Sequence, residues 1–198
     1  WNGSAWVQKG SKITNALYTN GGQANETLGW QVSINSDGSR IAASAPSMFT
    51  NKGGFSLFEY NASAVTSWTF LAQEMGEANG DYAGKSIDMD RSGNIIAIGS
   101  SRNHAENNSD TGHVRVFQYI YNPSGVDFVQ LGADIDGEST GDYFGDAVSL
   151  SGDGFTLAVG ARSNEGGGSS RGGVYIYKFT PTETTSWTQF RTDIDGGT

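Results

Sequence analysis

The sequence predicts an all-β protein built from repeated sheets of four short strands. Two observations carry this prediction. The 198-residue chain repeats itself with a period of about sixty residues. Within each repeat, short stretches of alternating apolar and polar residues are bounded by glycine. No stretch has the period of about 3.6 residues that marks an amphipathic helix, so we expect almost no helix.

The first strand of each repeat begins beside a glycine and alternates in apolarity, as a strand with one buried face does. Its three copies are LGWQVSIN at 28–35, AGKSIDMD at 83–90 and FGDAVSLS at 144–151. A glycine turn follows each copy, and its sequence suits a tight hairpin that needs positive φ. The turns cover residues 36–39, 91–94 and 151–154.

The second strand of each repeat is more continuously apolar and small, as expected for a strand covered on both faces. Its copies cover residues 40–46, 94–101 and 156–162. Gly99 and Gly160 occupy the same position in two of these copies, and we expect them to let adjacent sheets approach closely. The substitution Gly160→Val is therefore expected to destabilise the fold by about 1–3 kcal/mol, as overpacking does.

The third strand alternates again, and the fourth begins with an aromatic residue. The third strands cover 53–61, 111–119 and 171–179, and the fourth cover 67–74, 127–134 and 186–193. Residues 5–12 repeat the fourth strand once more. The leading aromatic residues recur in every copy, which favours a place in the core between sheets; they are Trp6, Trp68, Phe128 and Trp187.

Four antiparallel strands per repeat, with short edges, are typical of a β-propeller blade. A single blade cannot cover both of its faces, but neighbouring blades that stack face to face can. We divide the chain into residues 1–13 as the outer strand of a preceding blade, 14–74 as blade 1, 75–134 as blade 2, 135–193 as blade 3, and 194–198 as the start of a further repeat. A β-sandwich with accidental self-similarity is disfavoured by the number of aligned positions.

Three blades cannot close a ring, because closed propellers have about 4–8 blades. We therefore expect this chain to be completed by neighbouring blades. Because Trp1 is not an initiator methionine, we also expect the chain to be processed or to be a piece of a longer protein.

The segment from 128 to 162 carries a resemblance to a known family. It reads FVQLGADIDGESTGDYFGDAVSLSGDGFTLAVGAR. This resembles the FG-GAP-like propeller repeats, a class that includes the heads of integrin α-subunits, and also a group of acidic repeat proteins secreted by bacteria and algae. The first repeat departs most, since NALYTNGGQANETLG replaces the acidic segment at 15–29. The resemblance implies a β-propeller in an extracellular setting, without implying one activity.

The composition excludes several classes of function. A net charge of -9 at pH 7 opposes binding to nucleic acid or anionic lipid. The absence of cysteine excludes disulfides, cysteine-ligated zinc and thiol catalysis. No apolar run approaches the roughly 20 residues of a membrane-spanning helix. The five Trp, eight Tyr and ten Phe argue against disorder, because they can build a core.

Calcium is the first candidate cofactor, because integrin-type blades often bind it in acidic loops. The loop between the fourth strand of blade 2 and the first strand of blade 3 offers the best set of oxygen ligands. The candidates are Asp134, Asp136, Glu138 and Asp142. The hairpin turns are too short to wrap an ion, and the second repeat has MGEANGD at 75–81 in place of the acidic triplet. The alternative is that these acids only form turns and solvate loops.

Catalysis is not expected. A glycosidase needs a pair of carboxylates, but the acids of this chain recur with the repeat, whereas an active site should break the repeat once. No unrepeated cluster of Asp, Glu, His and Arg is apparent in the sequence. The two histidines, His104 and His113, are expected to be surface residues, with His113 at the start of a strand. We therefore predict no catalytic residues.

The remaining candidate sites are four glycosylation sites and one contact residue. The acceptor pattern Asn-x-Ser/Thr occurs in links between strands; the four asparagines are Asn2, Asn25, Asn61 and Asn107. We expect N-linked glycans there if the protein is eukaryotic and secreted. Trp30 is a candidate contact residue, because Lys85 and Asp146 take its place in the other repeats. Local repacking in the divergent first blade is the alternative explanation.

The function we expect is that of a non-catalytic extracellular structural or adhesive protein. It would assemble into a filament or surface layer with copies of itself or with adjacent repeats of the same chain. The alternative is a ligand-binding propeller, either lectin-like with a carbohydrate ligand or a calcium-assisted receptor module. A glycoside hydrolase is the third hypothesis. Polymers at native concentration would favour the first, and isolated closed rings the second.

Overall fold

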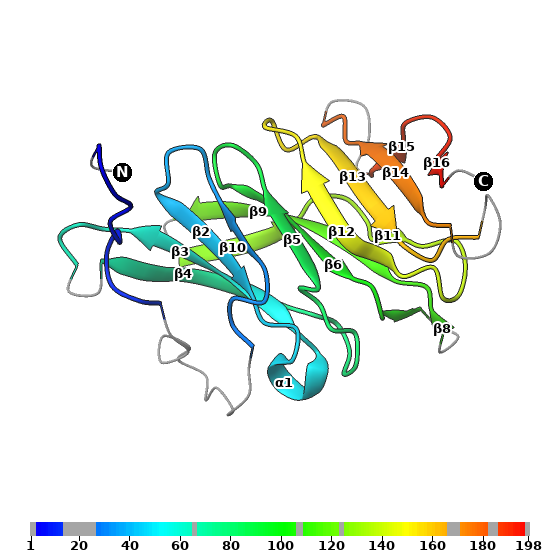
Figure 1. Ribbon diagram of the computed structural model, residues 1–198, viewed down its shortest axis with the longest axis horizontal. Coiled ribbons are helices and arrows are strands. Elements are labelled where there is room, and N and C mark those ends of the chain that lie inside the picture. The colour runs from blue at the N-terminus through cyan, green and yellow to red at the C-terminus, as the bar shows by residue number, and fades with distance from the viewer. Residues whose placement is uncertain are drawn as a thin grey trace.

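Three antiparallel sheets lie one after another along the computed structural model, in the order of the sequence (Figure 1). The structure describes residues 3–13, 27–64, 67–105, 109–122, 125–165, 171–181 and 186–196. The first sheet is blue to cyan in Figure 1, the second green, and the third yellow to orange. The protein is all-β, and each sheet is a propeller-type blade.

Each sheet follows the chain from one strand to its neighbour. Blade 1 has the order β1 (Val32–Ile34), β2 (Arg40–Ser44), β3 (Gly54–Tyr60) and β4 (Trp68–Met75). Blade 2 has the order β5 (Ser86–Met89), β6 (Ile95–Ser100), β9 (His113–Asn122) and β10 (Gly125–Gln130), and β11 (Ile135–Asp136) also pairs with β9. Blade 3 has the order β12 (Phe144–Leu150), β13 (Thr156–Ala161), β14 (Gly173–Lys178) and β15 (Thr188–Gln189), and β16 (Ile194–Asp195) also pairs with β14.

Little structure lies outside these blades in the described residues. β7 (His104–Ala105) and β8 (Ser109–Asp110) form a two-stranded ribbon between β6 and β9. The one helical element of the described chain is α1 (Met48–Asn51), a single irregular turn in which Phe49 and Thr50 have positive φ. The prediction of almost no helix is confirmed. No helix among these residues is long and apolar enough to cross a membrane.

The strand register repeats from blade to blade. Val32 pairs with Ala43, Ile87 with Ile98, and Val148 with Val159. These are the positions that the sequence repeat aligns. The glycines beside the start of each first strand repeat as well, since Gly29, Gly84 and Gly145 have φ values of 86°, 94° and 84°. The repeat is therefore a repeat of backbone geometry and not only of composition.

The core lies between the blades. Ala42 and Leu57 of blade 1 pack with Ile96 and Ile98 of blade 2. On the opposite face of blade 2, residues of β6 and β9 pack against blade 3; the cluster includes Ile95, Ala97, Val114, Val116, Leu157, Val159 and Tyr175. Every residue of β6 is buried, as predicted for a strand covered on both faces.

The outer faces of the first and third blades are exposed in this chain. We call them the leading face, formed by Val32, Ile34 and Ile41 of blade 1, and the trailing face, formed by Ala158, Gly160, Val174, Ile176 and Ile194 of blade 3. Val32 is 63% exposed, whereas Ile87 at the equivalent position of blade 2 is 7% exposed. Val174 is 40% exposed, whereas its equivalent Val114 is fully buried. Both faces thus present side chains that an adjacent blade would cover.

One prediction about glycine is wrong for this chain. At Gly99 an added Cβ would overlap the carbonyl oxygen of Gly145 in blade 3, so this glycine permits close packing of blades as expected. At Gly160 an added Cβ would meet only Ala147 of the same blade, at 3.3 Å. Gly160 lies on the exposed trailing face, so Gly160→Val does not block any packing within the described residues.

The N-terminal segment 3–13 contains no strand, although residues 5–12 repeat the fourth-strand sequence. Its hydrogen bond to blade 1 nevertheless matches a hydrogen bond between blades 2 and 3. The indole Nε1 of Trp68 donates to the carbonyl of Lys9 at 3.0 Å, and the indole Nε1 of Trp187 donates to the carbonyl of Leu131 at 2.7 Å. Lys9 and Leu131 are equivalent positions of the repeat. The segment therefore lies where a preceding fourth strand would lie, but without a described partner strand.

Candidate functional site

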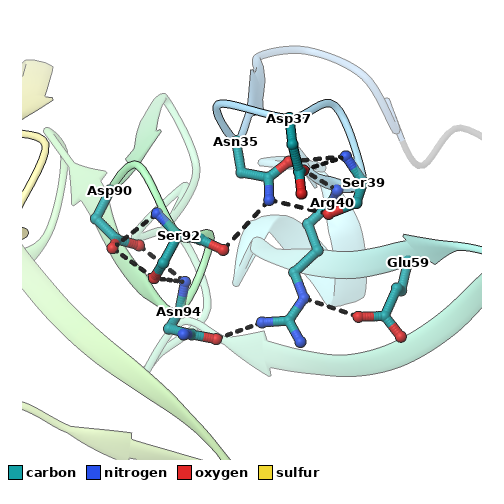
Figure 2. Close-up of polar contacts among 8 residues, drawn as sticks. All are labelled: Asn35, Asp37, Ser39, Arg40, Glu59, Asp90, Ser92 and Asn94. Atoms are coloured by element: carbon teal, nitrogen blue, oxygen red, sulfur yellow. Dashed lines mark hydrogen bonds and ion pairs between the residues drawn. The ribbon is translucent and has the colours of Figure 1, made fainter.

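The turns between the first and second strands do not offer a cation site. In blade 2, Asp90 Oδ1 accepts hydrogen bonds from the backbone N–H groups of Asn94 and Ile95, both at 2.8 Å, and Oδ2 accepts from Ser92 (Figure 2). In blade 1, Asn35 Oδ1 accepts from the backbone N–H groups that follow it in the same way. These side-chain oxygens accept hydrogen bonds from the backbone of the turn, as Asn and Asp side chains often do.

Arg40 joins the turns of two adjacent blades (Figure 2). Its guanidinium donates to Asn94 of blade 2 and to Glu59 of its own blade, the second at 3.0 Å. The same group lies 4.7 Å from the ring centroid of Tyr119. These contacts hold blade 1 to blade 2 at the rim, and none of them leaves a group directed at a ligand.

The four predicted calcium ligands do not come together on one point. Asp142 is buried, and its Oδ2 accepts a hydrogen bond from Asn164 at 3.0 Å. Glu138 is exposed, and Asp136 lies in β11, where burial raises the pKa of its carboxyl. Among the described residues, Asp134 instead joins Glu77 and His113. The structure thus places one of the four predicted residues, Asp134, beside a histidine.

We call Glu77, His113 and Asp134 the His113 cluster. His113 begins β9 and pairs with Ser100 of β6 and with Asp136 of β11. Glu77 lies in the loop after β4, and Asp134 directly precedes β11. The imidazole Nδ1 of His113 is 3.8 Å from Glu77 Oε2 and 4.0 Å from Asp134 Oδ2. Three separate parts of the chain meet at one end of blade 2.

The sequence reasoning missed this cluster because it placed His113 at the surface. His113 does begin a strand, as predicted, but it is only 1% exposed, so the surface prediction is wrong. A signal was present in the sequence. Glycine stands at the equivalent positions of the other repeats, Gly54 and Gly173, so His113 breaks the repeat.

Electrostatics keep the imidazole neutral near pH 7. Burial, together with the Arg115 guanidinium, lowers the pKa of His113 to about 4, while Asp134 and Asp81 oppose this shift. Burial also raises the pKa of Glu77, although Arg115 acts in the opposite direction. Since burial disfavours the charged form of any group, both directions follow from the position of the cluster between blades.

Arg115 completes the surroundings of the cluster. Its Nη2 donates to the carbonyl of Met75 at 2.7 Å, and its Nη1 is 3.8 Å from Glu77 Oε1. Two buried nitrogens, His113 Nε2 and Arg115 Nε, have no hydrogen-bond partner in the described part of the chain. Buried polar groups are nearly always satisfied, so these two atoms mark the cluster as unusual.

The remaining predicted residues lie apart from the cluster. Asn61 is exposed after β3, and its Oδ1 accepts from the backbone N–H of Ser63 at 3.0 Å. Asn2, Asn25 and Asn107 lie outside the described residues. Trp30 is half exposed, and the Lys85 ammonium lies 4.3 Å from its ring centroid. Trp30 is therefore partly open to solvent, and it contacts Lys85 of blade 2.

Comparison with known sequences supports the repeat assignment. Residues 133–177 match the family model of the FG-GAP repeat. The chain carries an FG-GAP-like repeat. The matched segment begins just before Asp134 and runs into β14, so it contains the acidic loop and most of blade 3. No curated protein sequence matches the chain.

Comparison with solved structures supports the propeller-like fold. A putative 6-phosphogluconolactonase from Bacteroides fragilis is similar with a TM-score of 0.56 and 14% identity, over 86% of this chain and 40% of that one. A second, from Bacteroides uniformis, has a TM-score of 0.56 and 11% identity, over 87% and 42%. Sqt1 from Chaetomium thermophilum has a TM-score of 0.54 and 14% identity, over 86% and 36%.

These likenesses concern the fold alone, because the identities are low. The chain spans about 40% of the length of the B. fragilis structure it matches. The neighbouring structures are therefore longer, and the additional length is what a larger set of blades requires. The fold prediction of propeller blades that this chain alone does not close is confirmed.

Proposed function

We propose that this chain is a non-catalytic structural or adhesive repeat protein of the extracellular space that assembles with copies of itself. The trailing face of one copy would pack against the leading face of the next, as blade 2 packs against blade 3 within the chain. One observation carries the proposal. The positions exposed on the two outer faces are those that are buried at the internal junctions.

The trailing face supplies one half of the argument. Ile194 is 63% exposed, whereas Ile135 at the equivalent position is 5% exposed and packs in the core between blades 2 and 3. A hollow of about 460 Å³ lies on this face, and its walls include Ala147, Gly160 and Val174. Apolar side chains left open around a hollow favour association with a surface of matching shape.

The leading face supplies the other half. A hollow of about 660 Å³ lies on it, lined mainly by apolar residues that include Ile13, Leu28, Val32, Ile34, Ile41 and Trp68. An adjacent blade would cover these side chains and gain the free energy of removing them from water. The strands of blade 1 would then have neighbours on both faces, as those of blade 2 have.

A second copy is the partner that fits both faces together. Within the chain, the carbonyl of Gly145 packs directly on Gly99. The equivalents on the outer faces are Gly29, which has nothing within 4 Å of an added Cβ, and Gly160, which has only its own blade near it. Gly29 has almost the same φ as Gly145, 86° against 84°. Gly29 of one copy can therefore pack on Gly160 of another copy. Repetition of this contact builds either an open filament or a closed ring of chains.

The extracellular setting and glycosylation are supported by the FG-GAP match and by the exposed sequon at Asn61. The non-catalytic character is supported by the recurrence of most acidic residues with the repeat, as expected of residues that shape turns. The similar solved structures support the fold alone, so the activities of those proteins are not assigned to this chain.

The test is the mass of the chain in solution. We expect sedimentation to show species larger than the 21.0 kDa single chain, with a fraction that rises over the micromolar range. Val174→Glu should block the trailing face and Val32→Glu the leading face, so each variant alone should remain a single chain. A mixture of the two should form pairs only, because each variant keeps one intact face.

The control is Tyr121→Glu, which places a charge on another exposed apolar residue, at the end of β9 and away from both faces. It should assemble like the unmodified chain. A chain that stays single at every concentration would overturn the proposal. Equal loss of assembly in Tyr121→Glu would also overturn it, because the effect would then be one of net charge.

A further inference from the structure

We propose that Glu77, His113 and Asp134 bind one divalent transition-metal ion, with Zn²⁺ as the best match to the ligands. This site goes beyond the proposed assembly and does not depend on it. It lies at the end of blade 2, between the loop after β4 and the start of β11. The ion would link the loop that enters blade 2 to the loop that leaves it.

The distances suit a shared ion. The ligand atoms of the three residues all lie within 4.8 Å of one another, and His113 Nδ1 is 3.8 and 4.0 Å from the two carboxylate oxygens. Zinc is bound at about 2.0–2.2 Å by His nitrogen and carboxylate oxygen in tetrahedral geometry, so two of its ligand atoms lie about 3.3–3.6 Å apart. Shifts of about 0.5–1 Å in the partly exposed side chains of Glu77 and Asp134 would bring all three ligand atoms into range.

The imidazole of His113 is an independent sign of a missing ligand. The residue is 1% exposed, yet both carboxylates are too distant for a hydrogen bond to Nδ1. Its Nε2, which the proposed ion would not contact, also lacks a hydrogen-bond partner among the described residues. Burying a polar ring without partners costs free energy. An ion between Nδ1 and the carboxylates would satisfy the nitrogen that faces the cluster.

Each carboxylate is oriented by a neighbour through one oxygen and leaves the other for the ion. Asp134 Oδ1 accepts a hydrogen bond from Gln130 Nε2 at 2.6 Å, while its Oδ2 faces His113. Glu77 Oε1 faces Arg115, while its Oε2 faces His113. Such outer contacts are typical of metal sites, where they fix the direction of the ligand atoms.

The local charge also favours a cation. The carboxylates of Asp81, Asp134 and Asp136 all act on Glu77, and Arg115 is the cation that acts on it from the described chain. Four acidic groups are thus opposed by one guanidinium. A divalent ion would lower the mutual repulsion of the carboxylates.

The ligand set selects the kind of ion. Calcium and magnesium prefer shells made of oxygen, whereas imidazole with carboxylate suits zinc and other transition metals. Three protein ligands would leave a coordination position for water, as in open zinc sites. The side chains of Glu77 and Asp134 are 46% and 32% exposed, so an ion could enter from solvent.

The third blade provides a natural comparison. Glu138 and Asp193 occupy the positions of Glu77 and Asp134, and both act on Tyr177 in blade 3. Gly173, however, stands where His113 would be, and Tyr175 replaces Arg115. The carboxylate pair is therefore shared by blades 2 and 3, and the histidine is the addition that makes a metal site.

The test is a calorimetric titration of metal-free chain with Zn²⁺, together with the visible absorption of bound Co²⁺. We expect one saturable site per chain and a shift of the Co²⁺ spectrum on binding. Glu77→Gln, His113→Gln and Asp134→Asn should each weaken Zn²⁺ binding by at least about tenfold, a loss of about 1.4 kcal/mol in binding free energy. Glu138→Gln is the matched control and should bind as the unmodified chain does.

Because His113 is buried, the circular dichroism of His113→Gln must first match that of the unmodified chain. Glu77→Gln alters a half-exposed side chain and carries the test if His113→Gln does not fold. The proposal is overturned if no saturable site is found, if Glu77→Gln binds as tightly as Glu138→Gln, or if Ca²⁺ binds the cluster more tightly than Zn²⁺.

Discussion

The second and third blades have the same strand register but different neighbours. Comparing them separates the properties that the repeat sequence determines from those that the adjacent blade determines. Val114 and Val174 occupy one position of the repeat, as do Ile135 and Ile194. In blade 2 these residues are in the core, and in blade 3 they are exposed. Strand pairing is thus a property of each repeat, whereas burial of its faces is a property of the blade beside it.

The same two blades differ in chemistry at one place. Each begins its third strand between two acidic loops, but blade 2 has His113 there and blade 3 has Gly173. The glycine leaves the carboxylates as solvated loop residues. The histidine places its Nδ1 at 3.8 Å from the carboxylate of Glu77 and 4.0 Å from that of Asp134. A single substitution within a repeat is therefore enough to turn a structural loop pair into a candidate ligand site.

The largest effect that would test this comparison is expected at the two equivalent glycines. Gly99→Val places a branched side chain against the backbone of Gly145, which cannot move without separating blades 2 and 3. We expect the free energy of unfolding to fall by more than about 4 kcal/mol. Gly160→Val should change it by less than about 0.5 kcal/mol, because the side chain points to an open face. Chemical denaturation of both variants measures the difference.

Similar losses in the two glycine variants would break the comparison. That result would mean that the trailing face is covered in solution even in the dilute sample. A dilution series would then show whether the loss in Gly160→Val disappears as the chains separate, which the proposed assembly requires.

A second, smaller effect is expected at the paired isoleucines. Ile135→Ala removes a side chain that is 5% exposed and leaves a cavity in the core between blades, so the free energy of unfolding should fall by about 3 kcal/mol. Ile194→Ala truncates a side chain that is 63% exposed and should cost less than about 0.5 kcal/mol. Thermal unfolding of both variants at low concentration provides the measurement. A cost at Ile194 equal to that at Ile135 would contradict the exposure of the trailing face.

Most of the fold could be predicted from the sequence, because strand and turn signals are local. The alignment of Val32, Ile87 and Val148 is the register that the structure shows. The burial of each copy could not be predicted in this way. Gly99 and Gly160 are alike in sequence, and only the blade that covers Gly99 makes the two different.

The candidate site was harder to predict, because its residues come from distant parts of the chain. Asp134 was recognised, but with Asp136, Glu138 and Asp142 as partners, since these are its neighbours in sequence. The pairing of β9 with β11 brings His113 next to this segment, and that pairing cannot be read from the neighbours of Asp134 in the sequence. The sequence does show that His113 stands where the other repeats have glycine. The burial of His113, however, arises only from the packing of blades.

The smallest effect concerns the two indole hydrogen bonds that link a blade to the segment before it. Trp187→Phe removes the hydrogen bond to the carbonyl of Leu131, which follows a paired strand of blade 2. We expect a loss of about 1 kcal/mol in the free energy of unfolding, as for one neutral hydrogen bond. Trp68→Phe removes the equivalent bond to Lys9, whose carbonyl lies in an exposed segment and can bind water instead, so its loss should be smaller.

Phe is a suitable replacement because the repeat already uses it at this position, in Phe128 of blade 2. Denaturant titrations of both variants give the two values, and amide hydrogen exchange of residues 3–13 shows whether the segment is released from blade 1. A greater cost for Trp68→Phe than for Trp187→Phe would contradict the prediction. It would mean that the N-terminal segment stabilises the leading face as strongly as one complete blade stabilises the next.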